Sequence, residues 1–289
     1  MLPTPEGGLA PAKINLALHV TGRRADGFHE LDTIAVFADL GDRLTVSPAS
    51  GLSIEVEGPF AHHAPAGDGN LAMLAARALA AADANSSLRG AKLRLCKEIP
   101  AGAGFGGGSA DAAAALRLLD KLWCLGTSDG ALAGIAVALG ADVPMCLDGK
   151  GLRARGRGER MVPIKGWPEL PLVLIWPGVQ VSTAAVFAAL DRRENPPLPE
   201  LTDAKTVADV ARYLKGCRND LEAPALAIAP AIGATLDRLH STEGCLLARM
   251  SGSGSGCFGF YPTPEAADTA AQAIRLAEPA WWVRSVAAC

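Results

Sequence analysis

The strongest chemical signal in this chain is a glycine-rich stretch that runs directly into an alanine-rich one. Residues 98–116 read EIPAGAGFGGGSADAAAAL. Because glycine lacks a Cβ atom, such a backbone can adopt positive φ and lie close to a ligand. Successive N–H groups then form a concave nest for an anion, and a helix that starts near Ser109 adds free amides and the positive end of its dipole. The stretch therefore predicts a cradle for phosphate, most simply that of a nucleotide.

Two other phosphate motifs and one structural explanation compete with this interpretation. Gly102, Gly104 and Gly107 satisfy GxGxxG, but the preceding segment 91–99 alternates like a half-exposed strand, unlike the buried first strand of a dinucleotide fold. A Walker loop needs lysine before its serine or threonine, and here the serine follows glycine. A flexible linker is the remaining alternative, although linkers seldom lead straight into so strong a helix.

A second glycine-rich loop, SGSGSGC at 251–257, lies between two segments with strand character. By itself this pattern indicates a hairpin turn or a bulge. Together with the first loop it would form a second wall of the phosphate site. The sequence leaves both alternatives open.

Other candidate groups favour structural interpretations. The pair His62 and His63 lacks the further ligands of a metal site, and His19 alternates with core positions of a predicted strand. The basic, glycine-spaced segment 149–164 indicates a solvated hairpin, with a phosphate-facing arginine as the alternative. The seven cysteines show no CxxC pair, so we expect reduced thiols.

The elements that would position these groups are mainly strands in the first half and mixed strands and helices in the second. Strand patterns lie at 13–20, 42–48, 51–58, 91–99, 169–177 and 281–288, with a strand and loop at 248–261. Helical patterns lie at 70–82, 109–122, 128–139, 204–215, 219–228, 229–240 and 264–277. Asn70 is the predicted N-cap of the first helix, and Gly140 ends the third.

Composition restricts the class of protein. The chain has 289 residues, of which 49% are hydrophobic, enough for two domains with a sizeable core. Its net charge of -3 argues against a globally basic nucleic-acid binder. No apolar stretch approaches the ~18 residues of a membrane span, and the N-terminus lacks a signal-peptide pattern. We therefore expect a soluble, cytoplasmic protein with no nucleic-acid or membrane partner. Nothing in the pattern predicts an oligomeric state.

Three segments, in order, resemble the motifs of the GHMP kinases, the family of galactokinase, homoserine kinase, mevalonate kinase and phosphomevalonate kinase. They are PAKINLALHV at 11–20, PAGAGFGGGSADAA at 100–113 and RMSGSGSGCFGFY at 249–261. The resemblance implies a two-domain α+β fold. A ribosomal protein S5 domain 2-like N-terminal domain with a left-handed crossover is expected at 1–155. A ferredoxin-like C-terminal domain that contributes to the substrate cleft is expected at 156–289.

Four further segments resemble one branch of this family. They are GRRADGFHELDT at 22–33, GADVPMCLDG at 140–149, ARGRGE at 154–159 and ND at 219–220. This resemblance implies transfer of a phosphoryl group from ATP, with Mg²⁺, to a hydroxyl of a small molecule that carries cytidine diphosphate. Kinases of homoserine, sugars or mevalonate derivatives are the alternative within the family. A non-catalytic nucleotide-binding regulator is the alternative outside it.

The resemblance also implies roles for individual residues. Lys13 and Asp142 match the family's catalytic pair. Asp142 would orient the acceptor hydroxyl and accept its proton late in the transfer, while Lys13 would neutralise charge on the transferring group or orient Asp142. The loop that would bind the ATP phosphates comprises Pro100, Ala101, Gly102, Ala103, Gly104, Phe105, Gly106, Gly107, Gly108, Ser109 and Ala110. Because Ala110 stands where serine is common, Ser109 is the one expected hydroxyl contact to phosphate or Mg²⁺.

The implied substrate-binding residues are Asn15, Phe28, His29, Lys97, Thr183 and Phe187. In this hypothesis the two phenylalanine rings stack on the cytosine. His29 can donate and accept hydrogen bonds, and the Lys97 ammonium can donate to the carbonyl of the base. Kinases of homoserine, sugars or mevalonate need no such nucleobase site, so these residues favour the cytidine-diphosphate substrate.

Overall fold

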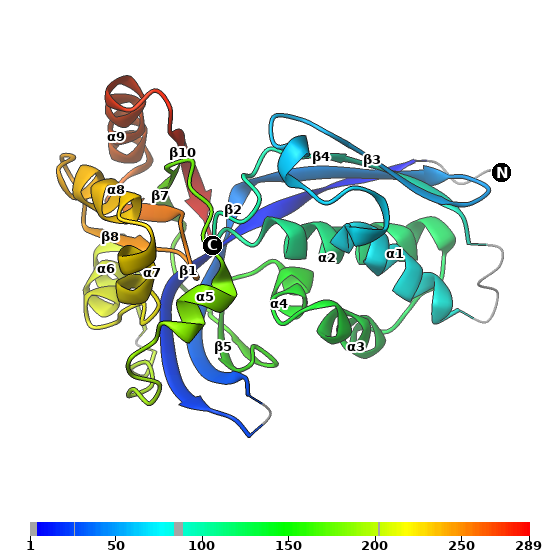
Figure 1. The fold of residues 1–289 in the computed structure, drawn as a ribbon, viewed down its shortest axis with the longest axis horizontal. Helices are drawn as coiled ribbons and strands as arrows, with labels where there is room; N and C mark the ends of the chain where they lie inside the picture. Colours follow the sequence, from blue (N-terminus) through cyan, green and yellow to red (C-terminus); the bar gives the residue numbers. More distant parts are fainter. Residues whose placement is uncertain (1–4, 26, 84–88, 202) are drawn as a thin grey trace. The chain divides into compact units, whose positions relative to one another are not determined.

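The computed structural model describes residues 5–25, 27–83, 89–201 and 203–289, which divide into two compact units (Figure 1). The first unit comprises Met1–Lys13, Leu40–Ala101 and Gly106–Gly149, and the second comprises Ile14–Asp39, Gly102–Phe105 and Lys150–Cys289. The sequence predicted one division, between residues 155 and 156. That division stays a prediction. The two compact units are interleaved along the chain, because the long strands β1 (Glu6–Arg23) and β2 (His29–Pro48) each contribute residues to both.

The first unit is a sheet with helices on one face (Figure 1). In it the C-terminal part of β2 pairs antiparallel with β4 (Ala91–Cys96), and β4 pairs parallel with β3 (Leu52–Glu57). As predicted for a half-exposed strand, every second residue of β4 points into the core: Ala91, Leu93 and Leu95 are fully buried. The helical elements of this unit are η1 (Ala61–His63), η2 (Gly67–Gly69), α1 (Leu71–Ala81), α2 (Gly107–Trp123), α3 (Asp129–Leu139) and α4 (Val143–Asp148).

The predicted ends of the first and third helices are confirmed. The Asn70 side chain accepts a hydrogen bond from the Ala72 amide at 2.9 Å, so it caps α1. Helix α3 begins after Ser128, and Gly140 is its C-cap. Helix α2 differs from the prediction, because it begins at Gly107 rather than near Ser109. Glycine has a low helix propensity, but a Cβ atom at Gly107 would lie only 3.3 Å from the buried Asp42 Oδ2 and Lys97 Nζ, which favours a residue without a side chain there.

The second unit contains an antiparallel sheet in which β10 (Trp282–Ala288) pairs with β7 (Leu170–Trp176), β7 with β9 (Cys257–Phe260), and β9 with β8 (Leu247–Met250). Every residue of β7 is buried. The helices of this unit are α5 (Thr183–Ala188), α6 (Val207–Lys215), α7 (Glu222–Ile228), α8 (Ala231–His240) and α9 (Pro264–Ala277). Apolar side chains of α8 and α9, such as Leu239 and Ile274, share one core with Val173, Ile175 and Val283 of the sheet.

The basic segment forms the predicted hairpin. Strands β5 (Leu152–Gly156) and β6 (Arg160–Pro163) pair antiparallel, and β5 also pairs with β2. The sequence predicted that the hairpin is solvated, but one of its arginines, Arg153, is buried. The buried Arg153 guanidinium donates to both carboxylate oxygens of Asp32, at 2.8 and 2.6 Å, and so fastens the hairpin to β2.

Among the described residues, every helix is too short or too polar to span a lipid bilayer. All the cysteines that the structure describes are free thiols, as the sequence predicted. Burial raises the pKa of Cys146 to about 12, so this thiol stays protonated and is a packing residue of α4 rather than a nucleophile.

Candidate active site

The predicted catalytic pair lies together in the first unit. The Lys13 ammonium on β1 is 2.7 Å from Asp142 Oδ2, and Asp142 immediately precedes α4. The two partners differ in exposure, with 3% of the lysine side chain and 44% of the aspartate side chain accessible. A buried cation therefore holds one oxygen of a carboxylate that solvent, and a hydroxyl substrate, can reach. This is the arrangement that orientation of an acceptor alcohol requires.

The start of α2 adjoins this pair. Gly106 precedes the helix with φ of 65°, and no side chain caps the first turn. The amides of Gly107, Gly108 and Ser109 therefore stand at the open N-terminus of a helix, where an anion is favoured. A Cβ atom added to Gly106 would lie 3.0 Å from the Lys13 Cβ atom. The glycine thus permits the helix start to approach the lysine of the pair.

Residues Gly102–Phe105 belong to the second unit, where the other glycine-rich loop packs against them. The Ser251 hydroxyl donates to the Gly104 carbonyl at 2.9 Å, and the Gly256 amide donates to the Ala103 carbonyl at 2.9 Å. A Cβ atom on Gly104 would lie 2.4 Å from the Ser251 carbonyl oxygen. The second loop connects β8 to β9 as a hairpin, which confirms the first of its two interpretations. Its role as a phosphate wall stays a prediction.

The remaining predicted loop residues differ in exposure. Pro100, Ala103, Phe105, Gly107 and Ala110 are buried, Ala101, Gly104, Gly106 and Ser109 are half-buried, and Gly102 and Gly108 are exposed. The Ser109 hydroxyl in the first turn of α2 is the predicted Mg²⁺ ligand. Among the residues that the structure describes, no three His, Cys, Asp or Glu side chains converge as a metal site. A Mg²⁺ ion bound together with ATP needs only one or two protein ligands, and the half-buried Ser109 hydroxyl would suit such a site.

Asn15 is buried in the second unit and held on two sides. Its Nδ2 donates to Thr33 Oγ1 at 2.8 Å, and its amide donates to Ser251 Oγ at 3.1 Å. Ser251 therefore binds both Asn15 and Gly104 within the second unit, and it belongs to the loop predicted from the sequence as a possible wall of the phosphate site.

Three of the predicted base-binding residues are aromatic side chains of the second unit. The His29 ring stacks on Phe187 of α5 with centroids 4.9 Å apart and planes 25° apart. Phe28 is 51% exposed, and the Arg157 guanidinium lies 3.6 Å above its ring centroid. The predicted Thr183 is exposed at the start of α5 and is 2.8 Å from the Ser253 hydroxyl. His29 and Phe187 are therefore in direct contact, so a base does not lie between them.

His29 carries the sharpest sign of a ligand in this group. Its Nε2 atom is buried and has no hydrogen-bond partner within the described part of the chain. Burial lowers the pKa of His29, and the nearby Arg193 and Arg23 lower it further. The neutral imidazole that results has one donor and one acceptor nitrogen. An unpaired buried polar atom costs free energy, and a ligand with a matching group removes that cost.

The structure corrects the assignment of Lys97. Its ammonium, expected to donate to a base, is buried and bonded to the carboxylates of Asp42 and Asp111. Its amide and carbonyl are also used, by Glu57 and Phe60. The prediction of a base contact was wrong for this side chain, because two acidic residues distant in the sequence attract its charge into the core.

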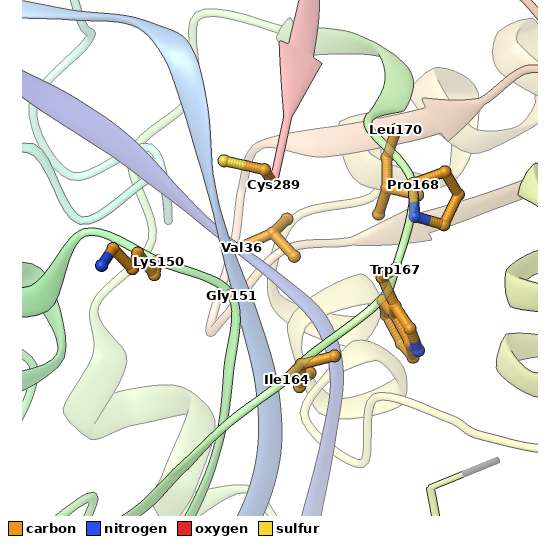
Figure 2. A pocket seen from close by; sticks show the side chains of 8 residues that line it. All are labelled: Val36, Lys150, Gly151, Ile164, Trp167, Pro168, Leu170 and Cys289. Carbon is orange, nitrogen blue, oxygen red and sulfur yellow. The ribbon is translucent and has the colours of Figure 1, made fainter. Parts of the chain in front are cut away.

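An apolar cavity of about 210 Å³ in the second unit lies apart from these residues. Figure 2 shows the side chains around it, which are Val36, Lys150, Gly151, Ile164, Trp167, Pro168, Leu170 and Cys289. It contains none of the predicted site residues, so it is not the candidate active site.

An ion-paired carboxylate therefore lies beside the uncapped, glycine-rich start of a helix on an α+β fold, an arrangement suited to phosphoryl transfer. Models of the GHMP kinases N terminal domain and the GHMP kinases C terminal domain match residues 70–150 and 198–279. The chain belongs to the GHMP kinase family and is a small-molecule kinase.

Relatives within the family narrow this class. The chain is 50% identical over 280 residues to the 4-diphosphocytidyl-2-C-methyl-D-erythritol kinase of Dinoroseobacter shibae, which covers 96% of this chain and 93% of the relative. It is 48% identical to the enzyme of the same name from Methylorubrum extorquens, over 95% of this chain and 96% of the relative.

Solved structures agree with this family membership. A crystal structure of 4-(cytidine 5'-diphospho)-2C-methyl-D-erythritol kinase matches with a TM-score of 0.80 and 37% identity, covering 98% of this chain and all (100%) of that one. Homoserine kinase from Cytophaga hutchinsonii matches with a TM-score of 0.70 and 17% identity, over 98% and 95% of the two chains. The second match shows a shared fold alone.

Proposed function

We propose that this protein phosphorylates the 2-hydroxyl of 4-diphosphocytidyl-2-C-methyl-D-erythritol with ATP, giving the 2-phosphate and ADP. The reaction belongs to non-mevalonate isoprenoid precursor biosynthesis and takes place in the cytoplasm. The names of relatives that are about half identical over nearly the whole chain support this substrate. The observation that carries the chemistry is the 2.7 Å pair of Lys13 and Asp142 beside the start of α2. The homoserine kinase match, at 17% identity, shows the fold alone and does not support another GHMP kinase substrate.

In this proposal the first unit binds the ATP phosphates and performs the transfer. The amides of Gly107, Gly108 and Ser109 donate to phosphate oxygens, and the Ser109 hydroxyl would hold Mg²⁺, which would neutralise charge on the phosphates. Asp142 accepts a hydrogen bond from the acceptor hydroxyl and takes its proton as the O–P bond forms. Lys13 fixes the carboxylate in this orientation and offers positive charge to the transferring group.

The second unit binds the cytidine part of the substrate. We assign the buried His29 Nε2 to the polar edge of cytosine, and the rings of Phe28 and Phe187 to its faces. Asn15 and Thr183 complete the proposed substrate contacts. The proposed substrate is a small molecule. The net charge of -3 argues against a nucleic-acid partner.

This assignment predicts that His29→Ala raises KM for the cytidylyl substrate at least about tenfold, equivalent to ~1.4 kcal/mol, while KM for ATP stays within about twofold. A site built on hydrogen bonds loses a buried partner in this variant. Steady-state kinetics with each substrate varied in turn provide the measurement. His62→Ala removes an exposed imidazole elsewhere and serves as the control. Equal changes in both KM values, or wild-type protein that uses a uridylyl analogue equally well, would show that His29 does not recognise the base.

A further inference from the structure

Three charged side chains meet in the core of the first unit, directly behind the start of α2. Asp42 comes from β2, Lys97 follows β4, and Asp111 lies on α2. The Lys97 ammonium bonds Asp42 Oδ2, and it bonds Asp111 Oδ2 at 2.7 Å. Their side chains are 0%, 2% and 4% exposed in the order Asp42, Lys97 and Asp111. We call these three residues the buried cluster.

Such a cluster is costly for the folded state unless its groups are well paired. Two carboxylates share one ammonium, and desolvation of each charge costs several kcal/mol in a protein interior. Burial lowers the pKa of Lys97, but Asp111 and Asp42 outweigh it and raise that pKa overall. Burial raises the pKa of Asp111; Lys97 opposes this rise and Asp42 adds to it. Oδ1 of Asp111 has no partner among the described residues. An apolar core would hold the fold at lower cost, so the cluster invites a functional explanation.

The position of the cluster supplies that explanation. A Cβ atom on Gly107 would lie 3.3 Å from both Asp42 Oδ2 and Lys97 Nζ, so the cluster touches the first residue of α2. Asp42 Oδ1 also accepts hydrogen bonds from the amides of Glu98 and Ile99, at 2.7 and 2.9 Å, and so fixes the segment between β4 and the glycine-rich loop. The cluster therefore connects β2, the end of β4 and the first two turns of α2 at one point.

We propose that Asp42, Lys97 and Asp111 are positioning residues for phosphoryl transfer, which hold the first turn of α2 where its amides meet the ATP phosphates. This inference rests on the proposed function and replaces the base contact first predicted for Lys97. Asp111 is the residue of α2 to which the Lys97 ammonium donates a hydrogen bond, and we call this bond the tether. Small displacements of a binding group have large effects, of order 10²-fold for about 1 Å.

The test compares two substitutions at Asp111 with a matched control. Asp111→Ala removes the tether, whereas Asp111→Asn retains an oxygen that can accept from Lys97. Arg153→Met breaks the buried ion pair with Asp32 in the second unit and controls for general loss of a buried charge pair. Calorimetry with Mg-ADP, and separately with CDP, gives Kd for each variant, and thermal unfolding gives Tm.

We expect Asp111→Ala to raise Kd for ADP at least about tenfold, or ~1.4 kcal/mol, with Kd for CDP within about twofold of wild type. Asp111→Asn restores ADP binding to within about threefold of wild type, because the hydrogen bond to Lys97 remains. Arg153→Met lowers Tm and leaves both Kd values unchanged. Should Asp111→Ala fail to fold, Asp111→Ser replaces it, since its shorter side chain leaves a polar group but does not reach Lys97.

An ADP affinity that stays at the wild-type value in the folded Asp111→Ala or Asp111→Ser protein, with only Tm lowered, would make the cluster a structural feature and overturn the proposal. ADP binding does not depend on the identity of the acceptor. If wild-type protein binds ADP but does not phosphorylate the cytidylyl substrate, the proposed function fails while this comparison still decides the positioning role.

Discussion

Asp142→Asn is expected to lower kcat by about 10³-fold, since a well-placed proton acceptor contributes about 10²–10⁴-fold. Asparagine keeps the size of the side chain and an oxygen for the Lys13 ammonium, so the 2.7 Å contact and the fold are retained. It cannot take the proton of the acceptor hydroxyl. Because the interaction is made mainly in the transition state, kcat and kcat/KM should fall together, and ADP affinity should change little.

The measurement for this variant is ADP release under saturating ATP and cytidylyl substrate. Asp148→Asn, an exposed aspartate of the same helix α4, is the matched control and should retain full activity. A kcat of Asp142→Asn close to that of Asp148→Asn would remove Asp142 from the catalytic pair.

The second large effect is expected at Gly106. Alanine at this position combines two penalties, a backbone with φ of 65° and a Cβ atom 3.0 Å from that of Lys13. Left-handed backbone at a non-glycine residue costs about 1–3 kcal/mol, and relief of the contact moves either the helix start or the lysine. We expect Gly106→Ala to raise Kd for ATP at least about tenfold and to lower kcat by about 10²-fold, since both effects follow from misplacement of reacting groups.

A second glycine serves as a control that separates the effect of backbone strain from the effect of the contact with Lys13. Gly126, between α2 and α3, has φ of 62°, but a Cβ atom there meets nothing within 4 Å. Gly126→Ala therefore carries the same strain without the contact, and calorimetry with a slowly hydrolysed ATP analogue compares the two variants. If both bind the nucleotide equally well, the approach of Gly106 to Lys13 has no part in phosphate binding. Gly107 is a poorer test, because its neighbours are the buried cluster and any added side chain disturbs the core.

The parts of the site that the sequence predicted are those with a local signature. A glycine-rich run before a strong helix former is visible in eleven residues, and the N-cap Asn70 and the C-cap Gly140 are equally local. Short elements lacked such a signal. Helices α4 and α5 have six residues each, too few for a 3.6-residue period to be recognised.

The wrong prediction that the Lys97 side chain contacts the base has a physical cause. It follows Leu93 and Leu95 at the same alternation, and both leucines are fully buried, so the strand pattern itself directed this lysine into the core. What the pattern lacked was the identity of its partners. Asp42 and Asp111 lie 55 and 14 residues away, and an aspartate among alanines on an otherwise buried helix face was the signal to use.

The interleaved units also lay outside what local patterns show. Periodicity predicted strands at 13–20 and 42–48, whereas β1 and β2 extend over 18 and 20 residues. The additional residues of β2 pair with β5, a contact set by a segment more than a hundred residues away. Nothing in the local spacing of residues 29–41 records that partner.

The central claim is that this chain transfers phosphate from ATP to a cytidine diphosphate-linked alcohol. The direct measurement is ADP release by the purified protein with Mg-ATP and, in separate reactions, 4-diphosphocytidyl-2-C-methyl-D-erythritol, homoserine and mevalonate, with the Asp142→Asn variant as the blank. We predict one ADP per molecule of the cytidylyl substrate consumed, and only the rate of the blank with homoserine or mevalonate. ADP release with homoserine or mevalonate but not with the cytidylyl substrate would contradict the account.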